Sequence, residues 1–212
     1  MQYSLTRTFK SLFYLLLASQ AGPCHAQDWK LEKQVQQITV SSQLNDDGYK
    51  NVQASTVVQS RPAALLRLFD DVQRAPLWIA NCIAVEVISA PSETERIVHS
   101  YFSAPWPIKN RDMVSYSLSS LQHNSLSITI SSRGKAYPLN EAYVRMEDMH
   151  GEWQVTELKN GQIQITYQGG GNPAGNLPRW LANKALIDAT FETFIKLSDI
   201  IIEDRYQQPE NY

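Results

Sequence analysis

Polar and apolar residues alternate along most of this chain. From Gln34 to Tyr167 the period is mostly two, and it is clearest in Ser125–Ser131, where leucine and isoleucine alternate with serine and threonine. Such alternation predicts strands with one covered face and one wet face. Short turns join most of the runs, so the sheet should be antiparallel. About nine strands are predicted: Ile38–Leu44, Val52–Thr56, Ile83–Ile88, Arg96–Phe102, Val114–Leu118, Ser125–Ser131, Tyr143–Glu147, Glu152–Leu158 and Gln162–Tyr167.

The period changes to that of a helix in the last long stretch, Leu177–Glu203. Asn176 is expected to cap this helix, and Pro178 is expected to lie in its first turn. Shorter helical segments are expected at Arg61–Phe69 and Pro76–Ile79. The long helix carries one apolar stripe at helical spacing, made of Trp180, Ile187, Phe191, Phe194, Ser198 and Ile201.

A geometric mismatch follows from these elements. Nine strands at about 4.8 Å spacing give a sheet roughly 40 Å wide, whereas a helix with its side chains is about 10 Å wide. The predicted fold is therefore α+β, with a curved antiparallel sheet around the long C-terminal helix. The interior is either filled by large side chains or left as a cavity for an apolar molecule. The possible lining residues are Tyr101, Tyr116, Tyr143, Trp153 and Tyr167.

The N-terminus has the layout of a secretory signal peptide. Arg7 and Lys10 precede an apolar run, and small residues lead to Ala26. We therefore expect a signal peptide over residues 1–26, a single domain over 27–212, and a protein that is exported to the periplasm or secreted. Cys82 is then the one cysteine of the mature chain, so no internal disulfide is expected. The net charge of −2 gives no case for nucleic-acid binding.

Motifs for chemistry are missing from the sequence. There is no nucleophile elbow, zinc spacing or paired-carboxylate motif. The run Gly169–Gly171 lacks the lysine and hydroxyl residues of a phosphate loop, so it is expected to end the sheet and to act as a hinge. No catalytic residue, metal or cofactor is expected.

Five segments, in order along the chain, resemble START domains, the lipid-binding domains related to steroidogenic acute regulatory protein. The resemblance runs from about Trp29 to Tyr206 and implies a helix-grip fold with a hydrophobic tunnel for one lipid or sterol-like molecule. Some sterol-binding members hold an acid and a base at two positions in the tunnel. In this chain one of these positions has Val98 or His99 and the other has Ser117, so a sterol-binding role is not carried over. The segments are Pro76–Cys82, Ala104–Val114, Tyr143–Met146, Gly151–Val155 and Leu177–Lys184.

Candidate ligand-binding residues follow from both lines of reasoning. Arg145 could bind an anionic group with two donors, or be a paired sheet charge. Lys184 could lie at the cavity mouth, or form a surface pair with Asp188 four residues on. The adjacent Arg111 and Asp112 could contact a lipid headgroup, or form a structural pair. The full candidate set is His99, Tyr101, Tyr116, Arg145, Trp153, Lys184 and Phe191.

The predicted function is binding, and with it transfer or sensing, of a lipid or other hydrophobic molecule in a tunnel between the sheet and the C-terminal helix. The expected partners are that molecule and, transiently, a membrane, and the protein is expected to be a monomer and not an enzyme. One alternative is a helix-grip enzyme of the cyclase or hydrolase type, with His99, Tyr116 or Arg145 converging in the cavity. Another is a structural module with a filled core.

Overall fold

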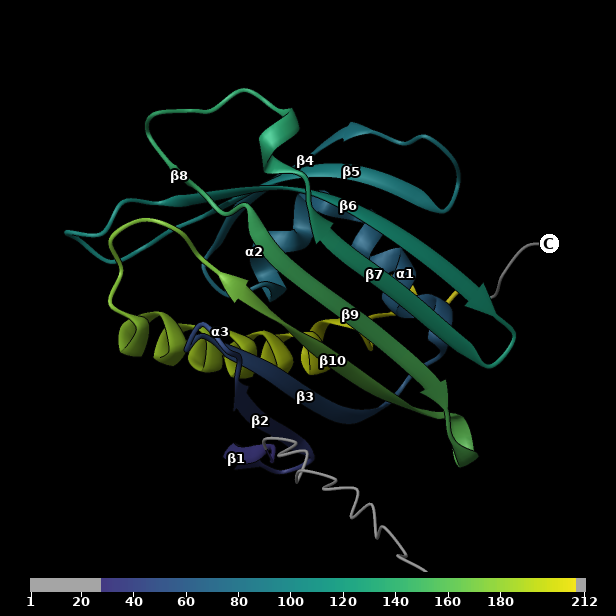
Figure 1. Cartoon of the computed structure of the whole chain (residues 1–212). Coiled ribbons are helices and arrows are strands. Elements are labelled where there is room, and N and C mark those ends of the chain that lie inside the picture. The colour runs from purple at the N-terminus through teal and green to yellow at the C-terminus, as the bar shows by residue number, and fades with distance from the viewer. Residues whose placement is uncertain (1–27, 209–212) are drawn as a thin grey trace, which may run out of the picture.

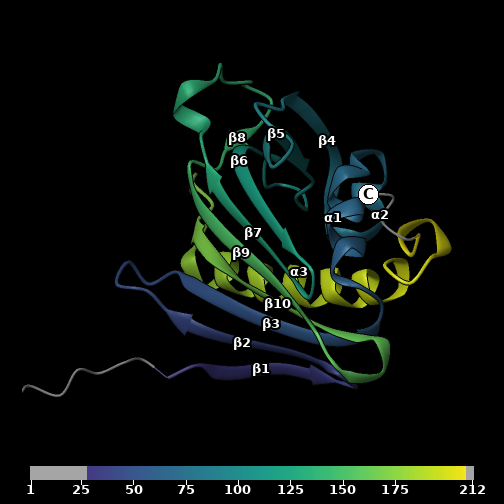
Figure 2. The same ribbon diagram turned by 90° about the vertical axis from the view of Figure 1, so that its right-hand side faces the viewer.

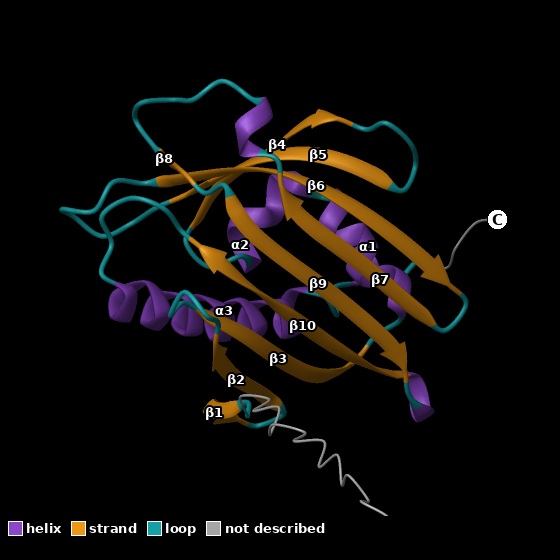
Figure 3. Cartoon of the chain, in the orientation of Figure 1, coloured by secondary structure: helices purple, strands orange, loops and turns teal. Residues whose placement is uncertain are grey.

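The computed structural model describes residues 28–208, so the expected leader over residues 1–26 lies outside the described residues. Figures 1 and 3 show a sheet of many strands with helices on one side of it. The strands are β1 (Lys30–Val35), β2 (Ile38–Leu44), β3 (Lys50–Gln59), β4 (Cys82–Ser89), β5 (Glu95–Phe102), β6 (Arg111–Gln122), β7 (Ser125–Ser132), β8 (Val144–Arg145), β9 (Asp148–Glu157) and β10 (Gln162–Asn172). The helices are α1 (Pro62–Asp70), α2 (Ala75–Trp78) and α3 (Arg179–Ile200).

The strands form one curved sheet in the order β1-β2-β3-β10-β9-β7-β6-β5-β4. Every neighbouring pair on this path is antiparallel, and the short β8 pairs in parallel with the start of β6. Figure 2 shows the sheet bending from β1 at its base to β4 at its top, with α3 crossing the concave side and α1 and α2 packed beside it. The predicted antiparallel sheet curved around a long C-terminal helix is confirmed.

One strand was not predicted, and one is much shorter than predicted. β1 lies at the edge of the sheet, and most of its side chains are exposed on both faces, so the sequence carries no alternation there. The predicted strand Tyr143–Glu147 shrinks to the two residues of β8.

The glycine run does not end the sheet, so the hinge prediction is wrong. Gly169, Gly170 and Gly171 are paired with β9 inside β10. The reason is space: a Cβ atom on Gly169 would lie 2.3 Å from the hydroxyl oxygen of Tyr167, and one on Gly171 would lie 1.9 Å from the carbonyl oxygen of Asp148. These glycines let the Tyr167 ring and the neighbouring strand approach closely.

The long helix begins later than predicted, and its buried face matches the predicted stripe only in part, since Ile187, Phe194 and Ile201 are buried. Pro178 occupies the N-cap position without a side-chain hydrogen bond, so Asn176 is not the cap. Trp180, which heads the predicted apolar stripe, is 69% exposed. The buried face is made of Ala182, Ile187, Thr190, Phe194, Leu197 and Ile200. The prediction followed the largest side chains, whereas the face turned towards the sheet carries alanine and threonine.

Trp153 on β9 is the centre of an aromatic cluster under α3. Its ring stacks on Phe194 with centroids 5.6 Å apart and lies 4.7 Å from the ring of Tyr167. Phe69 and Trp78 meet it edge-on at 5.6 and 6.1 Å. Edge-to-face and offset contacts at these distances favour a fixed packing. The cluster joins α1, α2 and α3 to the middle of the sheet.

Candidate functional site

A cavity of about 480 Å³ lies between the concave face of the sheet and the helices. Its walls come from β4, β5, β6, β7, β9 and β10, from α1 and α2, and mainly from the N-terminal half of α3. The volume falls in the lower half of the range of about 300–1,000 Å³ that is typical of small-molecule sites. The question whether the interior is filled or hollow is therefore answered: it is hollow.

Small side chains on both walls explain why space is left. On α3 the wall is made by Ala182, Ala185, Ala189 and other short residues, which recur at helical spacing. On β6 it is made by Ser115, Ser117 and Ser119 at every second position. A wall of larger side chains would close this gap, because protein interiors otherwise pack densely. The lining is mostly apolar; aliphatic and aromatic residues include Leu66, Leu68, Phe69, Trp78, Ile79, Val98, Phe102, Met113, Ile128, Ile130, Leu181 and Leu186.

Strand alternation decides which residues face the cavity. On β5, Val98 and Ser100 line it, whereas His99 and Tyr101 do not. On β6 the lining residues are the odd-numbered ones from Arg111 to Ser119. Even-numbered residues of β6 and odd-numbered residues of β5 therefore lie on the convex face. This arrangement puts Val98 and Ser117 at the two positions discussed for sterol-binding members.

Two arginines line the cavity in different electrostatic settings. Arg96 forms an ion pair with Asp70 at 3.5 Å and donates to three backbone carbonyl groups. Burial raises the pKa of Asp70, and the positive charge of Arg96 offsets this in part. Arg111 is 9% exposed, and burial lowers the pKa of its guanidinium group.

Of the seven candidate residues, Trp153 is the one that lines the cavity. His99, Tyr101, Tyr116 and Arg145 lie on the convex side of the sheet, so their predicted place in the tunnel is wrong. Of the five suggested lining aromatics, Trp153 and Tyr167 face the cavity, and the other three do not. The prediction assigned the wrong face of the strands to the cavity, and neighbouring residues on a strand point to opposite faces.

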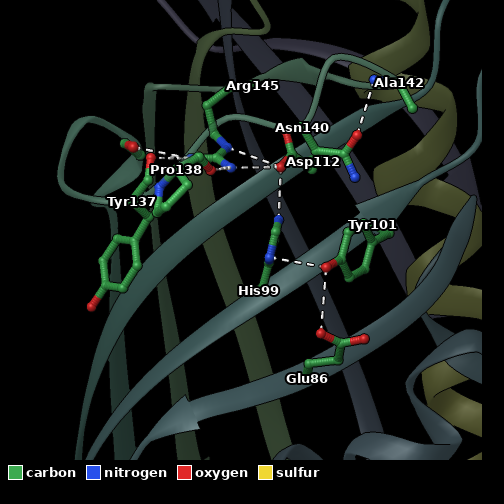
Figure 4. Close-up of polar contacts among 10 residues, drawn as sticks. Glu86, His99, Tyr101, Asp112, Tyr137, Pro138, Asn140, Ala142 and Arg145 are labelled. Carbon is green, nitrogen blue, oxygen red and sulfur yellow. Dashed lines mark hydrogen bonds and ion pairs between the residues drawn. The ribbon is translucent and has the colours of Figure 1, made fainter.

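Figure 4 shows the cluster that His99 and Arg145 form on the convex face. Asp112 accepts hydrogen bonds from Arg145 at 2.8 and 3.0 Å, and its Oδ2 lies 2.7 Å from Nε2 of His99. Arg145 also donates to the carbonyl oxygens of Gly134 and Pro138, which fixes the segment before β8 against the sheet.

This cluster sets the protonation of Asp112. Burial alone would raise the pKa of the carboxyl group, but the hydrogen bonds from Arg145 and His99 outweigh burial, and the pKa is lowered. Tyr101 completes the cluster, with its hydroxyl 3.0 Å from Nδ1 of His99. The arrangement is a structural clamp around a buried ion pair.

The remaining candidates also lie outside the cavity. Tyr116 donates a hydrogen bond to Glu95 on the convex face. Lys184 pairs with Asp188, which also pairs with Lys33 at 2.6 Å. Phe191 is half-buried under the ammonium group of Lys33, which lies 4.9 Å from the ring centroid. Arg111 was named only as a possible headgroup contact or structural pair. The alternation of β6 could have placed it on the cavity face, because every second residue of the strand points inwards.

Comparison with known proteins identifies the family. A model of the START domain family matches residues 19–196. A protein of Pseudomonas aeruginosa described as uncharacterised is 27% identical over 175 residues, covering 82% of this chain and 86% of that protein.

Several solved structures share the fold. A STAR-related lipid transfer protein from Xanthomonas axonopodis has a TM-score of 0.73 at 24% identity, covering 82% of this chain and 98% of that one. Human STARD10 has a TM-score of 0.73 at 20% identity, covering 84% and 74%. The Zhui aromatase/cyclase of Streptomyces has a TM-score of 0.51 at 12% identity, covering 71% and 90%. Since the family model spans most of the sequence, this chain belongs to the START domain family.

Proposed function

We propose that the protein binds a lipid or another hydrophobic molecule in the cavity between the sheet and α3. The observation that carries the proposal is the cavity of about 480 Å³ with its mostly apolar lining. Each methylene group moved from water into such a lining contributes about 0.8 kcal/mol, so an apolar chain can supply the affinity without further chemistry. The name of the Xanthomonas axonopodis relative, a lipid transfer protein, supports the same class of ligand.

We propose that access is gained at the N-terminal end of α3. The segment after the C-terminal end of α3 is tied down: Arg74 bonds to both carboxylate oxygens of Glu203 at 2.6 and 2.7 Å, and Tyr206 donates to Asp71 at 2.9 Å. The segments that line the cavity at the other end include residues 103–105 and Leu177. Movement of these loops with the first turns of α3 would open the cavity.

Residues 136–138 are not part of the proposed opening. Residues Ala136–Pro138 are absent from the cavity lining, and Arg145 holds the Pro138 carbonyl oxygen at 2.9 Å on the convex side. The proposed lid is therefore restricted to the segment around residues 103–108 and to the start of α3.

We further propose that the protein carries its ligand as an exported monomer that touches a membrane transiently. Trp106 and Trp180, on the two segments proposed to move, are 92% and 69% exposed. Large aromatic side chains suit the boundary between water and lipid. None of the helices within residues 28–208 has the length and apolar character needed to span a membrane.

The enzyme alternative predicts polar groups that converge inside the cavity. His99 and Arg145 do converge, but they do so on Asp112 at the convex face. The apolar lining therefore favours binding over catalysis. If the protein is a binder, an added apolar ligand will be recovered unchanged in mass after long incubation, whereas a cyclase or hydrolase would change its mass.

Native mass spectrometry of the full-length protein, purified without detergent, tests the proposed function. We expect a species heavier than the chain by one lipid-sized mass, which denaturation releases. Lipid-free protein should regain such a mass when it is mixed with phospholipid vesicles. A chain that carries no adduct and takes up none from vesicles would refute the proposal.

A further inference from the structure

Arg111 is a buried cation without a protein anion. It is the first residue of β6, it lines the cavity, and it is 9% exposed. Within residues 28–208 no carboxylate forms an ion pair with it, and its one hydrogen bond runs from Nη1 to the carbonyl oxygen of Lys109. The adjacent Asp112 does not neutralise Arg111, because its carboxylate points to the convex face and is held by Arg145.

An unpaired guanidinium in such a place is costly for the unliganded protein. Buried charges are normally paired, because removing an ion from water is expensive unless another charge or several hydrogen bonds replace the water. Burial lowers the pKa of Arg111, which is the expected direction for a cation with no nearby anion. An arginine nevertheless stays protonated in proteins, so the positive charge remains.

The position of Arg111 gives the cavity one charged end. The lining residues of β6 run from Arg111 to Ser119, which corresponds to roughly 27 Å along an extended strand. The loop before α3 passes beside the guanidinium, since a Cβ atom on Gly175 would lie 3.8 Å from Nη2. The cavity is thus elongated, with a cation at the end that borders this loop.

The other cavity arginine provides a contrast. Arg96 is already paired with Asp70 and donates to the carbonyl groups of Ser92, Glu93 and Glu95. Its charge is satisfied by the protein, so it has little to offer a ligand. The two arginines line one cavity, and one of them has free donors.

We infer that Arg111 binds the acidic head of the ligand, so that the protein takes an amphiphile with an oxyanion at one end and an apolar chain behind it. The planar guanidinium fork matches a carboxylate or a phosphate with two parallel hydrogen bonds. Nε and Nη2, the nitrogens with no protein acceptor among the described residues, supply the donors. This inference rests on the proposed function, since it assigns the head of the molecule that fills the cavity.

The test compares ligands that share one chain and differ in the head. Oleic acid and oleyl alcohol are titrated into the full-length protein, and binding is read from the fluorescence of Trp78 and Trp153, which line the cavity. Lysophosphatidic acid and monoacylglycerol with the same oleoyl chain form a second pair, which distinguishes a phosphate from a carboxylate as the preferred oxyanion. The variants are Arg111→Gln and, as the matched control, Arg96→Gln.

We expect wild-type protein to bind at least one acid roughly ten- to hundredfold more tightly than its neutral counterpart, the range expected for a charge-assisted hydrogen bond. Arg111→Gln should abolish this preference, so that each acid and its neutral counterpart bind with similar affinity. Arg96→Gln should keep the preference.

Two results would overturn the inference. One is equal affinity of wild-type protein for acid and alcohol, a comparison that stands even if Arg111→Gln fails to fold. The other is an Arg111→Gln variant that folds and weakens the neutral ligands as much as the acids, because that would make Arg111 structural. If the alcohol binds and no acid is preferred, the proposed function survives and this inference fails; if nothing binds, both fail.

Discussion

Replacing Ala189 by leucine should stabilise the unliganded protein and weaken ligand binding at the same time. Ala189 lies on the cavity wall formed by α3. Leucine adds three carbon atoms at about 0.8 kcal/mol each and loses about 0.5–1 kcal/mol of side-chain entropy. The variant should therefore be more stable by about 1.5–2 kcal/mol. For a chain of this size the midpoint of thermal unfolding should rise by about 3–8 °C.

The same three carbons occupy space that the ligand needs. If the ligand loses three methylene contacts, its affinity should fall by about 2.4 kcal/mol, or roughly fiftyfold. Thermal unfolding of lipid-free protein gives the first quantity, and titration with an oleoyl ligand gives the second. Opposite signs in the two measurements are the signature of a space that is empty in the free protein and filled in the complex.

Ala64 provides the control because it is a fully buried alanine of α1 that does not line the cavity. Ala64→Leu makes the same chemical change in a packed site, where overpacking should destabilise the protein by about 1–3 kcal/mol. If Ala189→Leu is destabilised like the control, the space between α3 and the sheet is not available in solution. If it is stabilised and ligand affinity is unchanged, the ligand binds elsewhere.

Three more outcomes follow from the described contacts. Asp112→Asn should lower the free energy of unfolding by about 3–5 kcal/mol, since it breaks a buried pair with Arg145. Because Arg145 and His99 lower the pKa of Asp112, its stabilising effect is complete above the pKa of the unfolded state and is lost as the pH falls through the pKa of the folded state. Unfolding measured as a function of acid pH should show this step in the wild type and lack it in the variant. Gly169→Ala places a Cβ 2.6 Å from a carbonyl oxygen of β9 and should lower the midpoint of thermal unfolding by several degrees, whereas an unchanged midpoint would contradict the packing described for β10. Burial raises the pKa of Cys82 to about 11, so iodoacetamide at pH 8 should label it slowly in the folded protein and quickly in urea; equal rates would argue against this environment.

The architecture could be predicted because strand and helix periods are strong signals. The alternation in Ser125–Ser131 corresponds to β7, and the helical run at the C-terminus corresponds to α3. β1 was not predicted because an edge strand that is exposed on both faces shows no alternation of polar and apolar residues. The run Gly169–Gly171 was misread because glycine usually marks a break, whereas here it makes room for a ring in the strand.

The site was harder to predict because several cavity-facing positions of β6 hold small polar residues. Ser115, Ser117 and Ser119 resemble the wet face of an amphipathic strand, yet they face the cavity. Their neighbour Tyr116 resembles an interior residue, yet it lies outside. Along this part of β6 the usual meaning of polar and apolar positions is therefore reversed. The place of Trp153 on the cavity wall was predicted correctly, because buried and exposed residues alternate along β9.

The alternation along β6 also ties the charge of the cavity to the alignment of its strands. Arg111 and Asp112 are neighbours with opposite charge, one directed inwards and the other outwards. A slip of β6 by a single residue against β5 would exchange them, and the cavity would then be lined by a carboxylate in place of a guanidinium. In this fold the hydrogen-bond ladder between two strands thus determines the sign of the charge that the cavity wall carries.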